Sequence, residues 1–549
     1  MTKPVHKDRL CNELLNNVVD RIAKVTPDSV YAELPRSPVD LSQGFRQVTY
    51  RDFANAINGI AWFLRTNLGP SETFETLTYI GPNDLRHNLL LLGSVKAGYK
   101  MLCTSPRYSS LGQVHLMKLV DCKTMLVPSE RPPVIDSILK EYEMRMLEIP
   151  ELDELLGHSY PDYPFDKKFA DARNGPLVVL HTSGTTGLPK PIIWTHDWAA
   201  SFGGQRQLIA PPGFELCDDL LLRTRILSLM PPFHAGHLFA SLLFTILCGT
   251  VIIYPLSTIP PSAQMASECL EYTTATALTL VPPYVEEIGR DPELLKRLSA
   301  KVNCIFWAGG DISLAAGNNI AAKTKLFTTC GSTEMGMWPT IRPKGGWTQE
   351  HWKYMRIHPA ANVSFRHQSN DLYEAFMVRN INMEDEQPIF KVFPGHQEFS
   401  SGDLFSPHAA DPELWQYRGR SDDLQTFSSG EKYHPVVVEQ RLARSPDIEG
   451  ALLVGTGRPK AALLLEIKRG KPQETPQQRE DILLQLWPLI EEVNTMCPTY
   501  AKITRDLTLI LSPARPMARA AKGTVQRSAT VALYEKELDM IFARSTTFA

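Results

Sequence analysis

The chain has 549 residues, of which 43% are hydrophobic and 21% charged, and its formal net charge is −3. This length exceeds what one hydrophobic core usually serves, so two or more folding units are expected. Because the charge is nearly balanced and no block of like charge occurs, we expect no nucleic-acid partner.

The sequence predicts neither a secretory leader nor a membrane span. The N-terminus lacks the apolar core of a secretory signal. The longest uncharged apolar run, residues 238–254, is short for a membrane span and is broken by Gly249, so a helix followed by a strand explains it better. The nine cysteines occur singly, without CxxC or zinc-type spacing. A reducing, cytoplasmic location is therefore expected.

Helices and apolar strands alternate over the first part of the chain. Residues 48–69 end a strand and then form an amphipathic helix closed by Gly69, and residues 83–99 form a helix with an Asn or Asp cap. Such alternation indicates parallel sheets, in which ligands gather at the carboxyl ends of the strands. Short strands are expected within residues 75–81, 100–106, 123–129, 176–184, 249–257, 276–283 and 303–313.

The pattern changes twice toward the C-terminus. From about residue 355 to 420 the strands become shorter, which indicates a β-rich subdomain. From residue 421 a helix, a strand pair, a further helix and a strand indicate a small α/β domain. We therefore predict an α/β fold with a large domain, residues 1–420, of parallel-rich sheets sandwiched by helices, and a small C-terminal domain, residues 421–549.

The segment HTSGTTGLPK, residues 181–190, is typical of a phosphate-binding loop. Its small residues let backbone amides approach a phosphate closely, and its lysine adds a point charge. The spacing differs from GxxxxGK[ST], which disfavours a P-loop NTPase. A flexible glycine loop between a strand and a helix is the alternative. The candidate phosphate contacts are Thr182, Ser183, Gly184, Thr185, Thr186, Gly187 and Lys190.

This string resembles the STGTTGxPK-type loops of the adenylate-forming superfamily, which includes acyl-CoA synthetases, peptide-synthetase adenylation domains and luciferases. Further motifs of that superfamily follow in the expected order. CGSTEMG resembles the GxTE motif, which implies that Thr333 contacts a phosphate and Glu334 holds Mg²⁺, an ion that prefers oxygen ligands. The resemblance places the following residues at ATP or AMP: Gly309 and Gly310 of WAGGDIS, Gly331, Ser332, Thr333, Asp403, Tyr417 and Arg420.

Two of these motifs imply particular contacts. SSGDLF carries Asp403, which by resemblance holds the ribose hydroxyls, a sound role for a carboxylate that accepts two hydrogen bonds. In YRGRSDDLQTFSSGEKYHP the resemblance implies that Arg420 also contacts ribose. It further implies that Asp422 is the hinge of a mobile small domain and that Gly430 lines a thiol channel.

The resemblance also implies a second lysine from the small domain, in a pattern like PxxxxGKxxR. It would neutralise charge between the reacting carboxylate and the α-phosphate. In this chain the corresponding sequence is PMARAAKGTVQR. Counting from Pro516 places Lys522 at that position, whereas counting back from Arg527 places Thr524 there. The order lysine then glycine resembles the ending of fungal single-module enzymes, so we take Lys522.

The segment PPFHAGHLF resembles one wall of the acyl pocket, with His234 as the gate beside the carboxylate. Peptide-synthetase domains for α-amino acids place an aspartate just after this point, but Ala235 and Gly236 stand here, so nothing local compensates an ammonium. An aryl, aryl α-keto or aliphatic acid is therefore predicted. The resemblance assigns the acyl pocket to His234, Trp307, Gly309, Cys330 and Met335.

The strings GPNDLR and KAGYKMLxxSPRxS, within residues 79–110, resemble fungal single-module peptide-synthetase-like enzymes, some of which end in a reductase and some in a thioesterase. The implied activity uses ATP and Mg²⁺ to make acyl-AMP and then loads the phosphopantetheine thiol of a carrier protein. No carrier segment with a GGxS-like serine is found, so the chain is expected to be either an excised adenylation domain or a free-standing enzyme whose carrier, or CoA, is separate. An acyl-CoA ligase, and an adenylate-binding sensor without turnover, are the alternatives.

Overall fold

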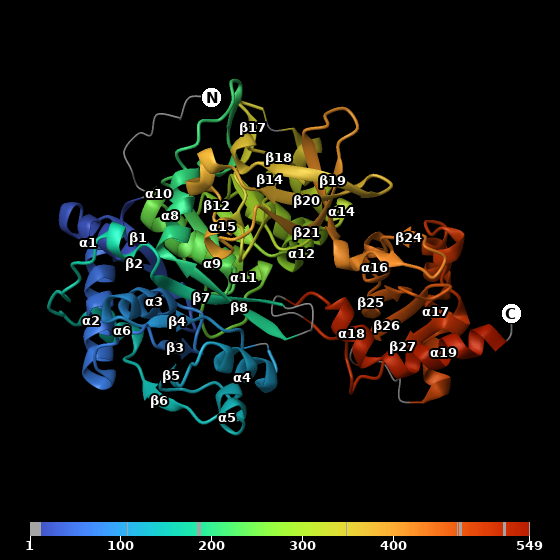
Figure 1. Cartoon of the computed structure of the whole chain (residues 1–549), viewed down its shortest axis with the longest axis horizontal. Coiled ribbons are helices and arrows are strands. Elements are labelled where there is room, and N and C mark those ends of the chain that lie inside the picture. The colour runs from blue at the N-terminus through green and yellow to red at the C-terminus, as the bar shows by residue number, and fades with distance from the viewer. Residues whose placement is uncertain are drawn as a thin grey trace.

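Two mixed sheets and one antiparallel sheet form the large N-terminal part of the molecule (Figure 1). The computed structural model describes residues 12–106, 108–183, 188–346, 348–468, 470, 475–519 and 523–547, with backbone alone at 183, 351, 546 and 547. Sheet A has seven strands, in the order β14 (Lys325–Thr328), β13 (Cys304–Trp307), β12 (Ala277–Leu280), β10 (Arg225–Ser228), β11 (Val251–Ile253), β1 (Val30–Pro35) and β2 (Phe45–Thr49).

Sheet B has six strands, and like sheet A it is parallel except for one edge strand. Its order is β6 (Arg145–Glu148), β5 (Thr124–Val127), β3 (Thr76–Tyr79), β4 (Lys100–Leu102), β7 (Pro176–Ser183) and β8 (Pro189–Thr195). The antiparallel sheet C runs β19 (Val363–Ser369), β20 (Leu372–Val378), β21 (Glu398–Pro407), β22 (Leu414–Arg420), β18 (Tyr354–Ile357), β17 (Thr340–Pro343) and β9 (Phe214–Leu216).

Helices cover both faces of sheets A and B. The largest core lies between the two sheets, and a second core lies on the outer face of sheet A, a third on the outer face of sheet B. The covering helices are α1 (Leu15–Val25), α2 (Tyr50–Leu68), α3 (Arg86–Ala97), α4 (Ser110–Leu119), α5 (Val134–Leu139), α8 (His196–Gln205), α9 (Ala235–Leu238), α10 (Thr245–Cys248), α11 (Ala263–Tyr272), α12 (Pro282–Arg290), α13 (Pro292–Ser299) and α14 (Leu314–Ala321). This arrangement confirms the predicted α/β class and the β-rich subdomain.

A buried polar network joins β1 of sheet A to helix α3 and to the segment between α9 and α10. The carbonyl of Ser241 accepts hydrogen bonds from Tyr31 Oη, Asn88 Nδ2 and Thr245 Oγ1. Ser241 lies in a π-helical turn, Phe239–Phe244, between α9 and α10. A π turn shifts the backbone hydrogen bonds by one residue, and such turns are frequent near functional sites. The sequence predicted a helix followed by a strand here, but not the π turn.

Local signals explain the helix ends. Helix α2 begins with a capping box between Thr49 and Asp52 and ends at Gly69, as predicted. Helix α3 begins at Arg86 instead of next to an Asn or Asp cap, although Asp84 accepts a hydrogen bond from the Arg86 N–H. In the part of the chain that the structure describes, no helix is long and apolar enough to cross a membrane.

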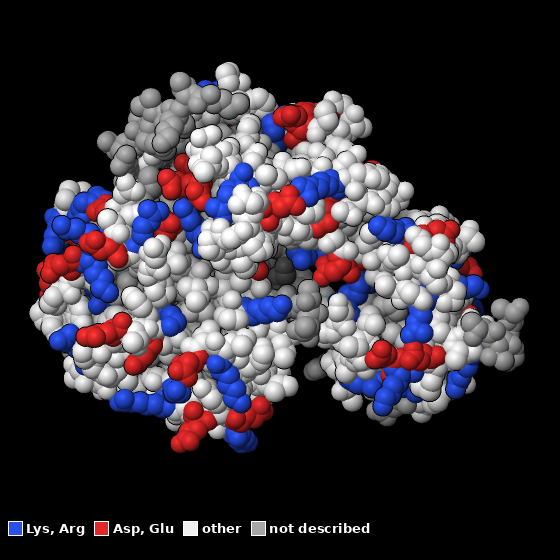
Figure 2. All heavy atoms as spheres, in the orientation of Figure 1, with Lys and Arg blue, Asp and Glu red and all other residues white. Residues whose placement is uncertain are grey.

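The small C-terminal part has a sheet of β25 (Ile448–Val454), β26 (Ala462–Ile467) and β27 (Thr508–Ile510). Helices α16 (Val436–Leu442) and α17 (Pro476–Asn494) cover one face, and α19 (Glu535–Thr547) covers the other, beside α18 (Arg527–Leu533). Figure 2 shows this part set off from the larger one by a notch, with basic and acidic side chains interspersed over the face displayed.

A buried arginine ties the small part to the segment that precedes it. Arg527 donates to both oxygens of Glu439, at 2.9 and 2.8 Å, to Asp423 at 3.0 Å and to the Leu453 carbonyl at 2.6 Å. Burial raises the pKa of Glu439 even though Arg527 opposes the shift. Arg527, which served in the sequence only to count back to Thr524, is 9% exposed.

We predict that Arg527→Met lowers the free energy of unfolding of the small part by about 3–5 kcal/mol, because Glu439 is left buried and unpaired. The exposed pair of Arg441 and Glu492 provides the control, and Arg441→Met is expected to cost less than about 1 kcal/mol. Hydrogen exchange of the β25 and β26 amides measures both. Equal effects of the two changes would contradict the prediction.

Candidate active site

The segment CGSTEMG forms a tight hairpin directly after β14. Strands β15 (Gly331–Ser332) and β16 (Gly336–Met337) pair antiparallel, and Ser332 Oγ accepts a hydrogen bond from the Met335 N–H. A side chain at Gly331 would lie 2.4 Å from the Gly336 carbonyl, so glycine is required there. Cys330, Thr333 and Met335 are buried, and Glu334 is half-buried.

Two stacked tryptophans hold the backbone of this hairpin. Trp194 of β8 and Trp198 of α8 lie face to face, with ring centroids 3.7 Å apart. Trp194 Nε1 donates to the Thr333 carbonyl at 2.7 Å, and Trp198 Nε1 donates to the Glu334 carbonyl at 3.2 Å. The residues that follow the glycine-rich segment thereby fix the two residues predicted to contact a phosphate and Mg²⁺.

Asp403 and Arg420 meet across neighbouring strands. They are direct partners in the β21–β22 ladder, and Arg420 Nη1 lies 3.2 Å from Asp403 Oδ1. Gly402 has φ of 66°, and a side chain there would collide with the Arg420 guanidinium. Burial opposes the charge of Arg420, but Asp403 and Asp422 outweigh this effect and hold its pKa above the ordinary value.

The hairpin and this ion pair belong to one group. Burial raises the pKa of the Tyr417 phenol and of the Cys330 thiol well above their ordinary values, and Asp403 raises both further. Both groups therefore keep their protons at neutral pH. The structure thus brings together Asp403, Tyr417 and Arg420, which the resemblance places at ATP or AMP, and Cys330, which it places in the acyl pocket.

His234 stands at the start of α9, where its Nδ1 accepts a hydrogen bond from the Gly236 N–H at 3.1 Å. Its electrostatic neighbours include His181 and His237, and burial lowers the pKa of each of these to about 3. The imidazoles of His181 and His237 are therefore neutral at physiological pH. Tyr108 Oη lies 3.0 Å from His181 Nδ1.

The glycine-rich segment joins β7 to β8. Thr182 is paired with Lys190 in this ladder, and the Lys190 side chain is exposed. Gly184, Thr185, Thr186 and Gly187 lie outside the described residues, as does the side chain of Ser183. Their predicted contacts with a phosphate stay predictions.

The structure does not bring Trp307 to His234. Side chains alternate between the faces of a strand, so Phe306 of β13 faces the core that holds Ala235 and Phe239, whereas Trp307 faces the outer core of sheet A. There its ring packs near Trp352, with centroids 6.4 Å apart. Gly309 and Gly310 follow the same strand, and Gly309 has φ of 97°.

The predicted hinge lies in a 3₁₀ turn, Ser421–Asp423. Asp422 Oδ1 lies 3.3 Å from Arg420 Nε, and Asp423 Oδ2 accepts from the Arg420 N–H at 3.3 Å. Gly430 lies in an exposed turn with φ of 84°. Lys522 lies outside the described residues, whereas Thr524 is exposed beside an isolated bridge between Arg519 and Val525.

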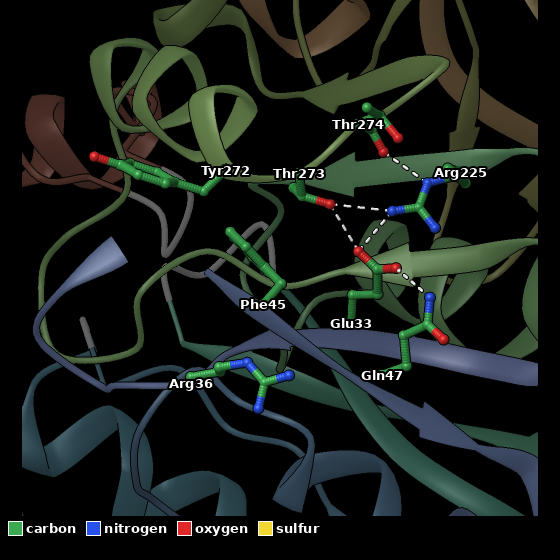
Figure 3. Close-up of a pocket in the computed structure, with 8 residues that line it drawn as sticks. All are labelled: Glu33, Arg36, Phe45, Gln47, Arg225, Tyr272, Thr273 and Thr274. Atoms are coloured by element: carbon green, nitrogen blue, oxygen red, sulfur yellow. Dashed lines mark hydrogen bonds and ion pairs between the residues drawn. The ribbon is translucent and has the colours of Figure 1, made fainter. Parts of the chain in front are cut away.

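A pocket of about 440 Å³ lies elsewhere on the large part (Figure 3). The pocket borders Arg225, the first residue of β10, whereas the motif PPFHAGHLF follows Ser228, the last residue of that strand. The pocket and the motif therefore lie at opposite ends of sheet A. Burial alone would raise the pKa of Glu33 in this pocket. Hydrogen bonds from Arg225, Thr273 and Gln47 outweigh that effect, so the pKa of Glu33 lies below its ordinary value. These polar groups satisfy one another, so the pocket is not the candidate site.

Sequence reasoning missed the residues that support the site from other elements. Trp194 and Trp198 follow the glycine-rich motif, and Tyr108 is the variable position of SPRxS, so no motif assigned a role to any of the three. The string PIIWTHDW offered one signal, since Trp194 and Trp198 are four residues apart and flank a strand-to-helix junction, but the partner carbonyls lie more than 130 residues away.

Known protein families match the large part and the small part of the chain separately. Residues 19–362 match the family described as AMP-binding enzymes, and residues 422–546 match the C-terminal domain of AMP-binding enzymes. The solved structure of O-succinylbenzoate coenzyme A synthetase from Bacillus subtilis, in complex with ATP and magnesium, has the same fold. Its TM-score is 0.67 at 15% identity, over 94% of this chain and 99% of that one.

Two curated fungal proteins are similar over most of the chain. The isocyanide synthase–NRPS hybrid crmA of Aspergillus fumigatus is 32% identical over 96% of this chain, which spans 33% of that protein. A carboxylic acid reductase of Neurospora crassa is 31% identical over 96% of this chain, which spans 50% of that protein. The family match over more than half of the chain and these relatives show that the chain belongs to the family of AMP-binding, adenylate-forming enzymes.

Proposed function

We propose that this enzyme activates a carboxylic acid with ATP as acyl-AMP, releasing pyrophosphate, and then transfers the acyl group to a phosphopantetheine thiol. The observation that carries the proposal is the grouping of Asp403, Arg420, Tyr417 and Cys330 beside the hairpin that bears Thr333 and Glu334. This group offers a carboxylate and a guanidinium to a ribose next to oxygen donors for a phosphate.

The residues fit ATP and a metal in different ways. Glu334 is half-buried, its backbone is fixed by Trp198, and an oxygen ligand of this kind suits Mg²⁺ shared with phosphates. A bound Mg²⁺ would screen phosphate charge. Asp403 would accept from the ribose hydroxyls, while Lys190, exposed beside the glycine-rich segment, would approach the phosphates.

Two neutral imidazoles lie near His234 and no carboxylate directly follows it, which supports a substrate without an α-amino group. His234 is followed by Ala235 and Gly236, and its histidine neighbours are neutral. A buried ammonium needs a carboxylate partner. We therefore propose an aryl, aryl α-keto or aliphatic acid, with His234 beside its carboxylate.

The names of the curated relatives suggest which thiol accepts the acyl group. The chain spans half or less of the two curated relatives, one named as a carboxylic acid reductase and one as a hybrid that includes a peptide synthetase. We propose a carrier domain as partner, in a parent enzyme with a reductase or thioesterase, and a cytoplasmic location. The large domain, residues 1–420, would bind both substrates. The small domain, residues 421–549, would move about Asp422 between the half-reactions and open a path for the thiol past Gly430.

We predict that a panel of aryl, α-keto and aliphatic acids includes at least one that drives exchange of labelled pyrophosphate into ATP. The exchange requires an acid that forms the adenylate reversibly, so a matching α-amino acid series serves as the control. If no acid supports exchange, the enzyme is instead an adenylate-binding sensor. With the active acid in hand, thioester formation on free CoA or on a phosphopantetheinylated carrier distinguishes an acyl-CoA ligase from the proposed transfer.

A second prediction concerns the lysine of the small domain. Lys522→Ala is expected to lower pyrophosphate exchange by about a hundredfold or more, because one preorganised charge on a transition state is worth that much. Thioester formation from preformed acyl-AMP should be spared. Thr524→Ala is the matched control, and a larger loss in Thr524→Ala would show that Thr524 occupies the lysine position.

A third prediction concerns the tryptophan pair. Trp194→Phe keeps an aromatic ring but leaves the Thr333 carbonyl without its donor, so the KM for ATP should rise about fivefold, equivalent to ~1 kcal/mol. Trp62 donates in the same way to the Pro161 carbonyl at 2.9 Å, far from the hairpin. Steady-state exchange kinetics of Trp62→Phe should therefore match the unmodified enzyme, and a similar rise in both variants would refute the prediction.

A further inference from the structure

The lysine proposed from the small domain lies in a segment whose two ends are held together. Arg519 and Val525 form an isolated antiparallel bridge, and the Gln526 N–H donates to the Ala518 carbonyl at 2.8 Å. Residues 520–524, named here the lysine loop, connect these two arms. Both positions considered for the lysine fall in this loop, so the arms determine where the lysine loop begins and ends in either register.

Glu466 of β26 holds the first arm. Its Oε2 accepts a hydrogen bond from the Met517 N–H at 3.2 Å, and Arg519 Nη1 lies 3.1 Å from Oε1 and 2.8 Å from Oε2. Arg519 Nη1 also donates to the Met517 carbonyl at 3.3 Å. A carboxylate offers acceptors alone, so it can satisfy a backbone N–H and a guanidinium together. The sheet of the small part thereby fixes the direction in which the chain enters the lysine loop.

Gly450 leaves the space for this contact. It is the partner of Glu466 in the β25–β26 ladder, and a side chain at this position would lie 3.0 Å from Met517 Sδ and 3.2 Å from Arg519 Nη2. Met517 is itself buried in the core beneath α19. The first arm is therefore packed against the sheet as well as hydrogen-bonded to it.

The second arm has its own anchors at the start of α18. Thr530 Oγ1, which is fully buried, accepts a hydrogen bond from the Ala518 N–H at 3.1 Å. Arg527 donates to Glu439 at 2.8 Å. The second arm thus stays in place when Glu466 is changed, and the first arm is the one that Glu466 controls.

We propose that Glu466 is a positioning residue of acid activation, which holds Met517 and Arg519 so that the lysine loop reaches the acid carboxylate and the α-phosphate. This inference rests on the proposed function, in which Lys522 stabilises the transition state. A charge stabilises a transition state only from the right place, and a displacement of about 1 Å can cost about a hundredfold in rate. In this role Glu466 contacts neither substrate and acts through the loop alone.

A merely structural role of Glu466 predicts a different result. Both half-reactions need a folded small domain, so a general loss of its structure would lower both. The proposed role is confined to adenylate formation, because the small domain removes the lysine loop before the thiol attacks. The two half-reactions therefore separate positioning of the loop from folding of the domain.

Glu466→Gln keeps the size of the side chain but replaces one acceptor oxygen by a donor, so the Met517 N–H or Arg519 loses its partner. In pyrophosphate exchange kcat should fall about tenfold or more, while the KM values for ATP and for the acid change less than about threefold. Thioester formation from preformed acyl-AMP should stay within about twofold of the unmodified enzyme. Unchanged exchange, or an equal loss in both half-reactions, would overturn the proposal.

Glu492→Gln is the matched control. Glu492 pairs with Arg441 on the same part of the molecule and its side chain is 54% exposed, so exchange by this variant should equal that of the unmodified enzyme. A loss as large as that in Glu466→Gln would show that any lost ion pair of the small part has this effect, and would overturn the proposal.

Combination with Lys522→Ala tests whether Glu466 acts through the lysine. Two residues that act as a unit are not additive, so Glu466→Gln should add less than about twofold to the loss that Lys522→Ala causes in pyrophosphate exchange. A further loss of about tenfold would show that Glu466 acts by another route and would overturn the proposal.

Where Glu466→Gln fails to fold, Arg519→Gln carries the test, because it breaks the same pair from its more exposed side. Exchange should fall while thioester formation holds, and unchanged exchange would overturn the proposal. Absence of exchange in the unmodified enzyme with every acid would instead refute the proposed function, so the two failures are distinguishable.

Discussion

The stack of Trp194 on Trp198 is the contact on which the geometry of the site depends. Two indoles donate to two successive carbonyls, of Thr333 and Glu334, while the ends of the same turn are paired as strands β15 and β16. The turn is thereby held at its backbone by sheet B, although it follows a strand of sheet A. Both sheets share one core, so the distance between the glycine-rich segment and the hairpin is set by packing that resists small shifts.

The surroundings of Asp403 and Arg420 differ in charge from the surroundings of His234. Around Asp403 and Arg420 the groups are charged and paired, and this suits a polar, hydroxyl-rich ligand. Around His234 burial keeps the imidazoles of His181 and His237 neutral and leaves hydrogen bonds as the means of recognition. In the proposed reaction, neutral groups here would leave the stabilising positive charge to the lysine expected from the small domain.

The sequence predicted the α/β class and the strands β3, β4, β5, β7, β11, β12 and β13, because apolar periodicity and turn residues are local signals, but it did not single out β1, β6, β10 or β14. It also placed Asp403 with Arg420 through resemblance. It could not show that Trp307 faces the outer core, since a strand buried on both faces has no alternation to reveal its orientation. The bonds of Tyr108 to His181 and of Trp194 to Thr333 join residues 73 and 139 positions apart, which no local pattern encodes.

A chain of ion pairs runs from Asp403 to the interior of the small part. Arg420 contacts Asp403 and Asp422, and Asp423 joins the Arg420 backbone to Arg527, whose other partner is Glu439. The half-exposed Arg420 contacts are weak because water screens them, whereas the Arg527 contacts are buried and resist separation. Rotation about Asp422 would therefore break the bonds of Arg420 first. Under the proposed function, a ribose that competes for Asp403 would loosen the same arginine and would couple occupancy of the nucleotide site to the freedom of the turn at residues 421–423.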